Sequence, residues 1–427
     1  MYLKLDHPPV SLDAYRPYMD SDLADELASV AAELRGARVA HLNATAIGGG
    51  VAEILQSMVP LFNALGIATE RIVIEPTEAE FFQVTKKIHN LLQGAEGSLS
   101  ERELEIYHGN LRQVATAMRR DQLSADVWFM HDPQLLPLAG MLRQGQPCGG
   151  GGAAWLWICH IDLTRPNQSA IDSLLPMHRD YDHLIFSLQQ YVPVKHVTDK
   201  PVYIAPPAID PLAEKNNPMD EKGAWDIVSS MGIDSHRPLI TQVSRFDLWK
   251  DPWGVIDAFR LARESVPGLQ LALLGLTQAS DDPEAGETLQ SVMAHAGSDP
   301  DIHLFHDPGL IPVGNDQAVN ALQMASSVLV QKSTREGFGL TVTEGMWKGK
   351  PMIGGNAGGI RIQIDDGQNG YLVSSPQECA RRIVTLLQDN DLAAFIGAAG
   401  RASVRRRFLL PRLALDYLKV AREHAAQ

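Results

Sequence analysis

The chain has 427 residues, of which 45% are hydrophobic and 21% are charged. This balance is typical of globular proteins and excludes a largely disordered or collagen-like chain. Lys and Arg number 37 against 51 Asp and Glu, so the formal net charge is −14, which disfavours a general nucleic-acid-binding surface. The length predicts two or three domains.

The cysteines and the apolar runs limit the compartments that we expect. Cys148, Cys159 and Cys379 are odd in number and widely spaced, which indicates neither a disulfide framework nor a zinc site. The histidines show no metal-ligand spacing, so we expect no protein metal site. The longest apolar run, residues 153–159, is too short to span a membrane, and the N-terminus does not resemble a signal peptide. We therefore expect a cytoplasmic protein that does not bind membranes.

The first half of the chain alternates helices and strands. A helix over 21–35, capped by Ser21, precedes a glycine-opened helix that Pro60 is expected to kink. The expected strands are 38–42, 72–74, 127–130, 155–159 and 183–186, and further helices are expected near 77–93 and 101–119. This alternation predicts βαβ units and a parallel sheet. The proline-rich segment 201–218 is expected to resist regular structure and to act as a linker.

The same rhythm returns after that linker. The expected strands are 239–243, 271–274, 302–305, 328–331 and 352–354. The expected helices are 255–264, 289–296, 319–325, 338–347, 376–388 and a segment from 392 to the end. The fold class is therefore α/β, with two doubly wound Rossmann-like domains facing a central cleft. Such sheets bind ligands beyond the carboxyl ends of their strands, so functional residues should directly follow strands.

A run of three glycines, residues 48–50, follows the first of these strands and opens a helix. Glycine lets the backbone approach a ligand closely, and helix-start N–H groups favour an anion or a hydroxyl-rich ring. The alternative is a tight strand-to-helix turn. The run is not G-x-G-x-x-G, which disfavours a dinucleotide-dependent dehydrogenase.

Two basic residues follow the first strand of the second half. Arg245 and Lys250 lie just beyond strand 239–243 and could together bind a diphosphate. The alternative is a solvated surface pair bridged to Asp247 and Asp251.

Two glutamates eight residues apart are the sharpest feature of the sequence. Glu336 is expected at a strand-to-helix turn and Glu344 inside the helix, roughly 12 Å further along its axis. Their carboxylates could hold hydroxyls on two parts of one extended ligand, while N–H groups from Gly337 to Leu340 face an anion. The alternative is an exposed acidic helix.

Histidine–aspartate groups follow two strands of the first half. His131 and Asp132 follow strand 127–130, and His160 and Asp162 follow strand 155–159. These side chains are expected to line the cleft, where they could bind a sugar or act as acid or base. The alternative for each histidine is a structural role in the core.

These residues resemble those of a known family. The segment Glu336–Glu344 is similar to the E-x7-E signature of retaining glycosyltransferases of the GT-B architecture, and Arg245 and Lys250 match their phosphate-binding pair. The N-terminal half resembles the trehalose synthases, which transfer glucose from a nucleotide sugar to free glucose. The resemblance spans residues 39–370, and its matching stretches are 43–55, 80–90, 131–134, 157–163, 243–252 and 348–355.

The resemblance implies a GT-B fold in which domain 213–409 binds a nucleoside diphosphate glucose. Glu344 would hold the ribose hydroxyls and Glu336 the glucose hydroxyls. Arg245 and Lys250 would neutralise the leaving diphosphate. The remaining implied contacts are the backbone positions Gly337, Phe338, Gly339 and Leu340.

By the same resemblance, domain 1–212 would bind the acceptor glucose, and helix 410–427 would cross back onto it. His160 would contact the transferred sugar near the reaction centre. The implied acceptor-binding residues are Gly49, Gly50, Glu75, Asp132 and Asp162. The product would be the α,α-1,1 disaccharide trehalose, formed with retention and without a metal or a tightly bound cofactor.

Several alternatives stay open at this point. The same pocket would suit a trehalose phosphorylase, a sugar-phosphate epimerase or a non-catalytic nucleotide-sugar-binding protein. The base pocket is expected near His306 and Asp307, where nothing discriminates ADP-, UDP- and GDP-glucose. The expected partners are these small molecules, and a homodimer is compatible with the sequence.

Overall fold

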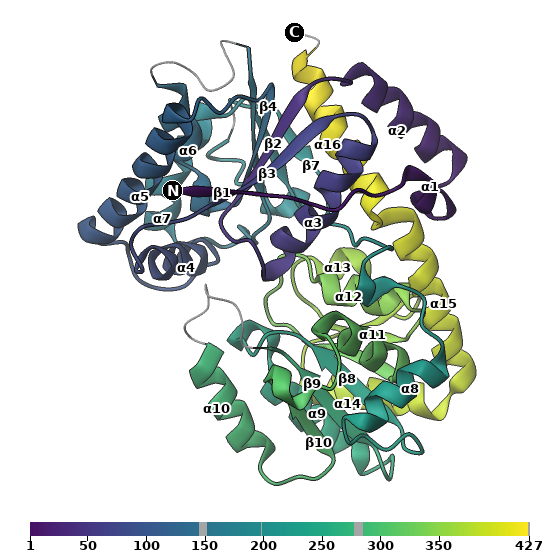
Figure 1. The fold of residues 1–427 in the computed structure, drawn as a ribbon. Helices are drawn as coiled ribbons and strands as arrows, with labels where there is room; N and C mark the ends of the chain where they lie inside the picture. Colours follow the sequence, from purple (N-terminus) through teal and green to yellow (C-terminus); the bar gives the residue numbers. More distant parts are fainter. Residues whose placement is uncertain (145–151, 198, 277–284, 426–427) are drawn as a thin grey trace. The chain divides into compact units, whose positions relative to one another are not determined.

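The chain folds into two compact units (Figure 1). A computed structural model describes residues 1–144, 152–197, 199–276 and 285–425. Within these ranges the first unit comprises Met1–Ala208 and the segment from Leu410 on, and the second unit runs from Ile209 to Leu409. Cys159 and Cys379 are free and buried thiols, while Cys148 lies outside the described residues.

The first unit is built on a seven-stranded sheet in the order β1-β3-β2-β4-β5-β6-β7. Its strands are β1 Tyr2–Leu5, β2 Arg38–Asn43, β3 Ala68–Ile74, β4 Val127–His131, β5 Ala154–Cys159, β6 His183–Phe186 and β7 Val202–Ile204. Edge strand β1 runs antiparallel to β3, and the other strands are parallel. Because β4 and β5 are buried along their whole length, they read in the sequence as continuous apolar runs.

Helices cover both faces of this sheet, as a parallel sheet requires. They are α1 Leu12–Tyr15, α2 Ser21–Glu33, α3 Gly49–Ala64, α4 Phe81–Leu92, α5 Glu101–Arg120, α6 Leu138–Arg143, α7 Gln168–Leu174 and α16 Leu410–Ala425. The C-terminal helix α16, yellow in Figure 1, packs against α2 and α3. Its Arg412 also donates to the carbonyl of Pro206.

Local details of the first unit differ from the sequence expectations. Helix α2 is capped by Asp20, whose carboxylate accepts from the N–H of Leu23, and not by Ser21. Helix α3 continues through Pro60 to Ala64. The expectation that the proline-rich segment lacks regular structure is wrong for β7, which pairs with β6. An edge strand tolerates nearby proline because its outer N–H groups need no partner.

The second unit has a six-stranded, wholly parallel sheet in the order β10-β9-β8-β11-β12-β13. Its strands are β8 Leu239–Val243, β9 Gln270–Leu274, β10 Ile302–Phe305, β11 Val328–Gln331, β12 Met352–Gly355 and β13 Tyr371–Val373. Its helices are α8 Glu221–Ser230, α9 Pro252–Arg263, α10 Ala285–Ala296, α11 Asn315–Ala325, α12 Leu340–Trp347, α13 Ile360–Gln363, α14 Pro376–Gln388 and α15 Asn390–Arg407.

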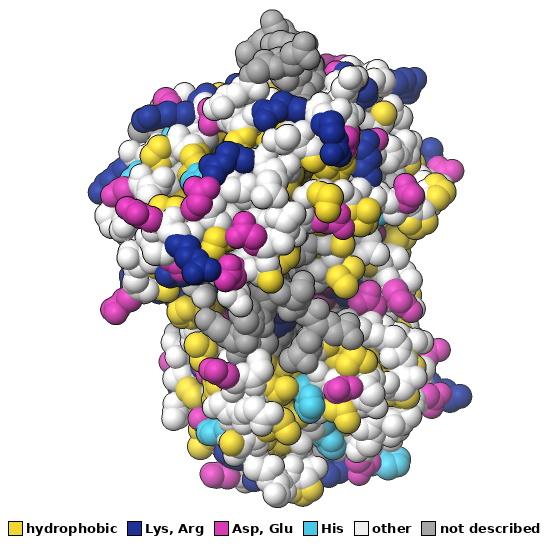
Figure 2. Space-filling model, turned by 60° about the vertical axis from the view of Figure 1, so that its left-hand side comes forward, with side chains coloured by type: hydrophobic (Ala, Val, Ile, Leu, Met, Phe, Trp, Pro, Cys, Tyr) yellow, Lys and Arg dark blue, Asp and Glu magenta, His cyan; other side chains and the backbone are white. Residues whose placement is uncertain are grey.

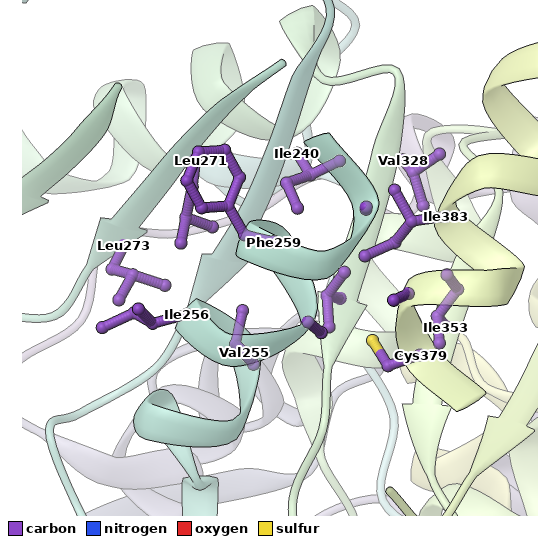
Figure 3. Close-up of a cluster of buried hydrophobic side chains, with 14 of the residues drawn as sticks. Ile240, Val255, Ile256, Phe259, Leu271, Leu273, Val328, Ile353, Cys379 and Ile383 are labelled. Carbon is purple, nitrogen blue, oxygen red and sulfur yellow. The ribbon is translucent and has the colours of Figure 1, made fainter. Parts of the chain in front are cut away.

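A large apolar cluster fixes α9 and α14 onto one face of this sheet (Figure 3). Phe259 of α9 lies over Leu271 of β9, while Ile383 of α14 lies near Ile353 of β12. Full burial of each such side chain contributes roughly 1.5–3 kcal/mol. A separate cluster packs α8 and α11 against the sheet.

Both sheets contain one point at which the strand order reverses. It lies between β2 and β4 in the first unit and between β8 and β11 in the second. In doubly wound folds ligands bind at this point, beyond the carboxyl ends of the strands. The polar segments singled out in the sequence follow these strands or their neighbours.

The surface shows no separation of charge by sign on the face drawn in Figure 2, where acidic and basic side chains are interspersed. Together with the net charge of −14, this offers no extended basic field for a phosphate backbone on that face. None of the described helices combines the length and apolarity needed to cross a membrane.

Candidate functional site

The loops that follow β8 and β11 bring a lysine and a glutamate together in the second unit. The Nζ of Lys250 lies 2.6 Å from Oε2 of Glu336, and the hydroxyl of Ser333 donates to the same oxygen at 3.0 Å. Both charged side chains are largely buried. The sequence did not single out Ser333, although its position directly after a buried strand was a usable signal.

Contacts between the same two loops hold this pair in place. The N–H of Thr334 donates to the carbonyl of Trp249 at 2.8 Å, and the Arg335 guanidinium stacks over the Trp249 ring at 4.8 Å. Asp251 pairs with Lys332, a buried lysine that sequence reasoning missed. Lys250 therefore pairs with Glu336 across the switch point, whereas Asp251 pairs with Lys332, so the alternative of a solvated surface pair does not describe Lys250.

Arg245 lies on the same loop with its side chain 39% exposed. Its guanidinium is 3.8 Å from the carboxylate of Asp247, a long pair that matches part of the surface alternative. An exposed pair of this length contributes about 0–1 kcal/mol, so Asp247 does not hold the arginine strongly.

The segment from Glu336 to Gly339 is a loop and not the first turn of a helix. Helix α12 begins at Leu340 after Gly339, whose φ of 88° is a left-handed conformation that favours glycine. The expected 12 Å of helix between the two glutamates is therefore wrong, because the helix rises by only about 6 Å from its first residue, Leu340, to Glu344. Gln363 fixes the loop by donating to the carbonyl of Phe338 at 2.6 Å.

Glu344 lies inside the unit, where its side chain is 1% exposed. Lys215 is 2.6 Å from its carboxylate, and Lys348 is close enough to act on it electrostatically. Burial raises the pKa of Glu344, but the two ammonium groups outweigh burial, so the net shift is downward. Burial also lowers the pKa of Lys348 to about 7. The alternative interpretation, an exposed acidic helix, is thus wrong, since Glu336 is buried as well.

In the first unit a buried arginine shapes the loop between β2 and α3. Arg71 of β3 donates to the side-chain oxygen of Asn43 at 3.1 Å and to the carbonyls of Thr45 and Ala46 at 3.0 and 2.9 Å. The loop then reaches the glycine run 48–50, whose residues are exposed and in which α3 begins at Gly49. Sequence reasoning missed Arg71, although a basic residue beside an apolar strand was a usable signal.

Asp132 and His160 meet at the carboxyl ends of β4 and β5. The Asp132 carboxylate accepts from the main-chain N–H of His160 at 2.8 Å, and burial raises the pKa of this carboxyl group. Asp132 has a φ of 63°, an uncommon conformation for a residue with a side chain. Such strain occurs often at functional sites. His131 extends the contact, since its Nδ1 lies 3.1 Å from Nε2 of His160.

The two other carboxylates predicted to bind the acceptor, Asp162 and Glu75, belong to residues with other contacts. Asp162 accepts from the N–H and the hydroxyl of Thr164 at 2.9 and 2.6 Å. Glu75 is exposed after β3, and its main chain pairs with Met1. Among the described residues no group of three or more His, Cys, Asp or Glu side chains is placed to hold a metal ion.

Comparison with known proteins places this geometry in a family. Residues 41–193 match the family described as "Trehalose synthase, N-terminal domain", and residues 224–403 match "Glycosyl transferases group 1". A trehalose synthase from Rubrobacter xylanophilus is 42% identical over 410 residues, covering 96% of each chain. The chain belongs to the trehalose synthase family. It is accordingly an enzyme of trehalose-related glycosyl transfer.

More distant similarities agree with the fold. The structure of a UDP-forming α,α-trehalose-phosphate synthase from Burkholderia xenovorans superimposes with a TM-score of 0.73 at 16% identity, covering 91% of this chain and 99% of that one. The expected GT-B architecture is thereby confirmed. A trehalose phosphorylase from Pleurotus pulmonarius is 28% identical, but the match spans 85% of this chain and 54% of that protein.

Proposed function

We propose that this protein transfers glucose from a nucleoside diphosphate glucose to free glucose and forms α,α-trehalose with retention at the anomeric carbon. The observation that carries the proposal is the Lys250–Glu336 pair, which joins a cation and a carboxylate at the switch point of the second unit. A nucleotide sugar needs both groups, one for its phosphates and one for its sugar hydroxyls.

The donor binds to the second unit in this proposal. Lys250 and Arg245 face the diphosphate, and Glu336 with the backbone from Gly337 to Leu340 holds the glucose. Glu344, held by Lys215, binds the ribose hydroxyls. The loop between β11 and α12 suits this role because two hydrogen bonds fix its backbone. Gln363 donates to the carbonyl of Phe338, and the N–H of Gly359 donates to the carbonyl of Glu336.

Charge development explains how the cations accelerate the reaction. As the bond from the glucose C1 to the phosphate oxygen breaks, negative charge grows on the departing diphosphate. Lys250 and Arg245 stabilise this charge more strongly in the transition state than in the bound donor, which lowers the barrier. The pairing of Lys250 with Glu336 keeps the ammonium group in place for this task.

The acceptor binds to the first unit. Asp132, Asp162, Glu75 and the backbone of Gly49 and Gly50 hold the acceptor glucose, and His160 contacts the transferred sugar. The acceptor hydroxyl attacks C1 from the face that the diphosphate leaves, and its proton passes to the departing phosphate oxygen. No protein nucleophile is then required, and the configuration at C1 is retained.

The direct test is to incubate the purified protein with glucose and, in separate reactions, ADP-, UDP- and GDP-glucose. The proposal expects a non-reducing α,α-1,1 disaccharide together with the matching nucleoside diphosphate. NMR of the product reports the anomeric configuration at both linked carbons. A disaccharide of any other linkage, or no disaccharide with all three donors, would overturn the proposal.

A trehalose phosphorylase is the second candidate, because a phosphorylase is among the relatives. Such an enzyme would use inorganic phosphate and trehalose with the same cationic pair. Incubation with trehalose and phosphate alone discriminates the two candidates, since only a phosphorylase releases glucose 1-phosphate without any nucleotide. A nucleotide-sugar-binding protein without turnover would bind the donor and form neither product.

A further inference from the structure

Three histidines of the first unit form a continuous hydrogen-bonded chain. The Nδ1 of His41 lies 3.0 Å from the Nε2 of His131, and the Nδ1 of His131 lies 3.1 Å from the Nε2 of His160. His41 and His131 are fully buried, and the rings of His131 and His160 are stacked with an interplanar angle of 4°. The chain leads from the core of the sheet to the edge at which Asp132 lies.

The sheet register explains why these rings meet. His41 of β2 is paired with Phe129 of β4, and His131 of β4 is paired with Ile158 of β5. Because side chains alternate along a strand, Phe129 and His131 share one face, as do Ile158 and His160. The three imidazoles therefore form a diagonal row across three neighbouring strands on a single face.

The two contacts leave the neutral chain only two arrangements of its protons. Each contact needs one N–H and one bare nitrogen, and a neutral ring has one of each. If His131 carries its proton on Nε2, then His41 and His160 do so too. If His131 carries its proton on Nδ1, His41 and His160 carry theirs on Nδ1 as well. The tautomer of His160 is thus fixed by the direction of the whole chain.

Charged neighbours at the two ends favour the same direction. Arg71 of β3 is paired in register with His41 of β2. Among the described residues its guanidinium donates to one amide oxygen and two carbonyl oxygens and to no carboxylate, so its positive charge is not neutralised. A positive charge favours an unprotonated nitrogen on the side of each imidazole ring that faces it. At the other end the carboxylate of Asp132 accepts from the main-chain N–H of His160 and also acts electrostatically on its imidazole, where a negative charge favours an N–H.

We propose that Arg71, His41 and His131 are positioning residues that hold His160 in the Nδ1–H tautomer, so that its imidazole serves the sugar site as a hydrogen-bond donor. The inference rests on the proposed function for the location of the sugar. The Nδ1 of His160 and the Nε2 of His41 are the two ends of the chain, and within the described residues both are buried atoms without a hydrogen-bond partner.

The surroundings of the chain keep its rings neutral. Burial lowers the pKa of His41 to about 3, with Arg71 adding to the effect, and it lowers the pKa of His131 and His160 as well. The other elements packed on His41 contribute the aromatic rings of Phe62, Phe129 and Tyr417. At neutral pH none of the three imidazoles therefore gains a second proton, so the direction of the hydrogen bonds between them does not change.

Neutron diffraction from crystals of the deuterated full-length protein tests the direction without any substrate. The expected result is a deuteron on Nδ1 of each of the three rings. A deuteron on Nε2 of His160, or on both nitrogens of any ring, would overturn the inference. Because this readout is independent of activity, it holds even if the protein forms no trehalose, in which case only the proposed function fails.

Variants at His41 test the positioning role. Asn at position 41 can donate to His131 as the imidazole does, whereas Leu cannot. We expect His41→Asn to lower kcat less than 10-fold and His41→Leu to lower it more than 10-fold, with KM for the donor unchanged in both. His295→Asn, at an exposed pair with Asp257, is the matched control and should not change kcat. Equal effects of the two His41 variants would contradict the positioning role.

Discussion

Lys250 and Glu336 approach to 2.6 Å although 86 residues of chain separate them, because the loops after β8 and β11 emerge side by side at the switch point of the second sheet. The pair is only partly accessible, so the local dielectric is lower than in water and each charge strongly affects the other.

Glu336→Gln removes the negative charge and keeps the shape of the side chain. In the proposed mechanism the substitution weakens the hold on the transferred sugar and leaves Lys250 without its carboxylate. We expect kcat for trehalose formation to fall by at least about 100-fold, the effect of losing one transition-state contact. The measurement is the initial rate with saturating donor and glucose, accompanied by a thermal unfolding curve.

Glu70→Gln is the matched control, because Glu70 also forms a 2.6 Å pair with a lysine, Lys4, but at an exposed site. The control should retain wild-type kcat. If Glu336→Gln kept full activity, Glu336 would have no place in the transfer.

Arg245→Ala removes the second cation that the mechanism assigns to the diphosphate. We expect kcat to fall by about 100-fold or more, and Arg245→Lys to recover part of it because the charge returns without the paired hydrogen bonds. Since the Arg245 side chain is 39% exposed and its pair with Asp247 is long, the melting temperature should stay within a few degrees of wild type. Equal rates for Arg245→Ala and wild type would exclude Arg245 from the site.

The elements predicted from sequence agree best with the structure where apolar runs are continuous. Strands β8, β10 and β11 have the predicted limits, and β8 and β11 are almost wholly buried. Strand β1 was missed because it is short, lies at an edge and is mostly exposed, so no hydrophobic pattern marks it. Strand β7 was missed because its proline-rich surroundings suggested a linker.

The candidate site could be predicted as a set of residues but not as a set of pairs. Position after a strand indicated Arg245, Lys250 and Glu336, because parallel strands all end at one edge of the sheet. The partner of each charge depends on loop conformation, which is why Lys250 pairs with Glu336 and not with Asp251. The link between Lys215 and Glu344 joins distant parts of the chain, and no local pattern reveals it.

The buried ammonium group of Lys348 should make stability depend on pH. Its pKa is about 7 in the folded protein against an ordinary value of 10.5. Between these values the unfolded chain binds more protons than the folded one, so the free energy of unfolding rises with pH. We expect wild type to gain about 1 kcal/mol per pH unit over Lys348→Met between pH 8 and pH 9.5.

Urea unfolding of both proteins at several pH values measures this difference. Lys222→Met, a change at an exposed lysine, is the control and should follow wild type at every pH. Parallel curves for wild type and Lys348→Met would mean that Lys348 keeps an ordinary pKa.

Two buried tyrosines of the first unit offer a matched test of hydroxyl burial. Within the described residues the hydroxyl of Tyr417, on α16, is a buried group without a hydrogen-bond partner. The hydroxyl of Tyr181 donates to the carbonyl of Leu136 at 3.0 Å. An unsatisfied buried polar group costs about 1–3 kcal/mol, whereas a satisfied hydrogen bond contributes about 1 kcal/mol.

Tyr417→Phe should therefore be at least as stable as wild type, and Tyr181→Phe should lose about 1 kcal/mol, because only the latter leaves a buried carbonyl without its donor. Urea unfolding under identical conditions gives both values. A loss above 1 kcal/mol in Tyr417→Phe would show that the Tyr417 hydroxyl does bind a partner in the folded unit, where α16 packs against α2 and α3.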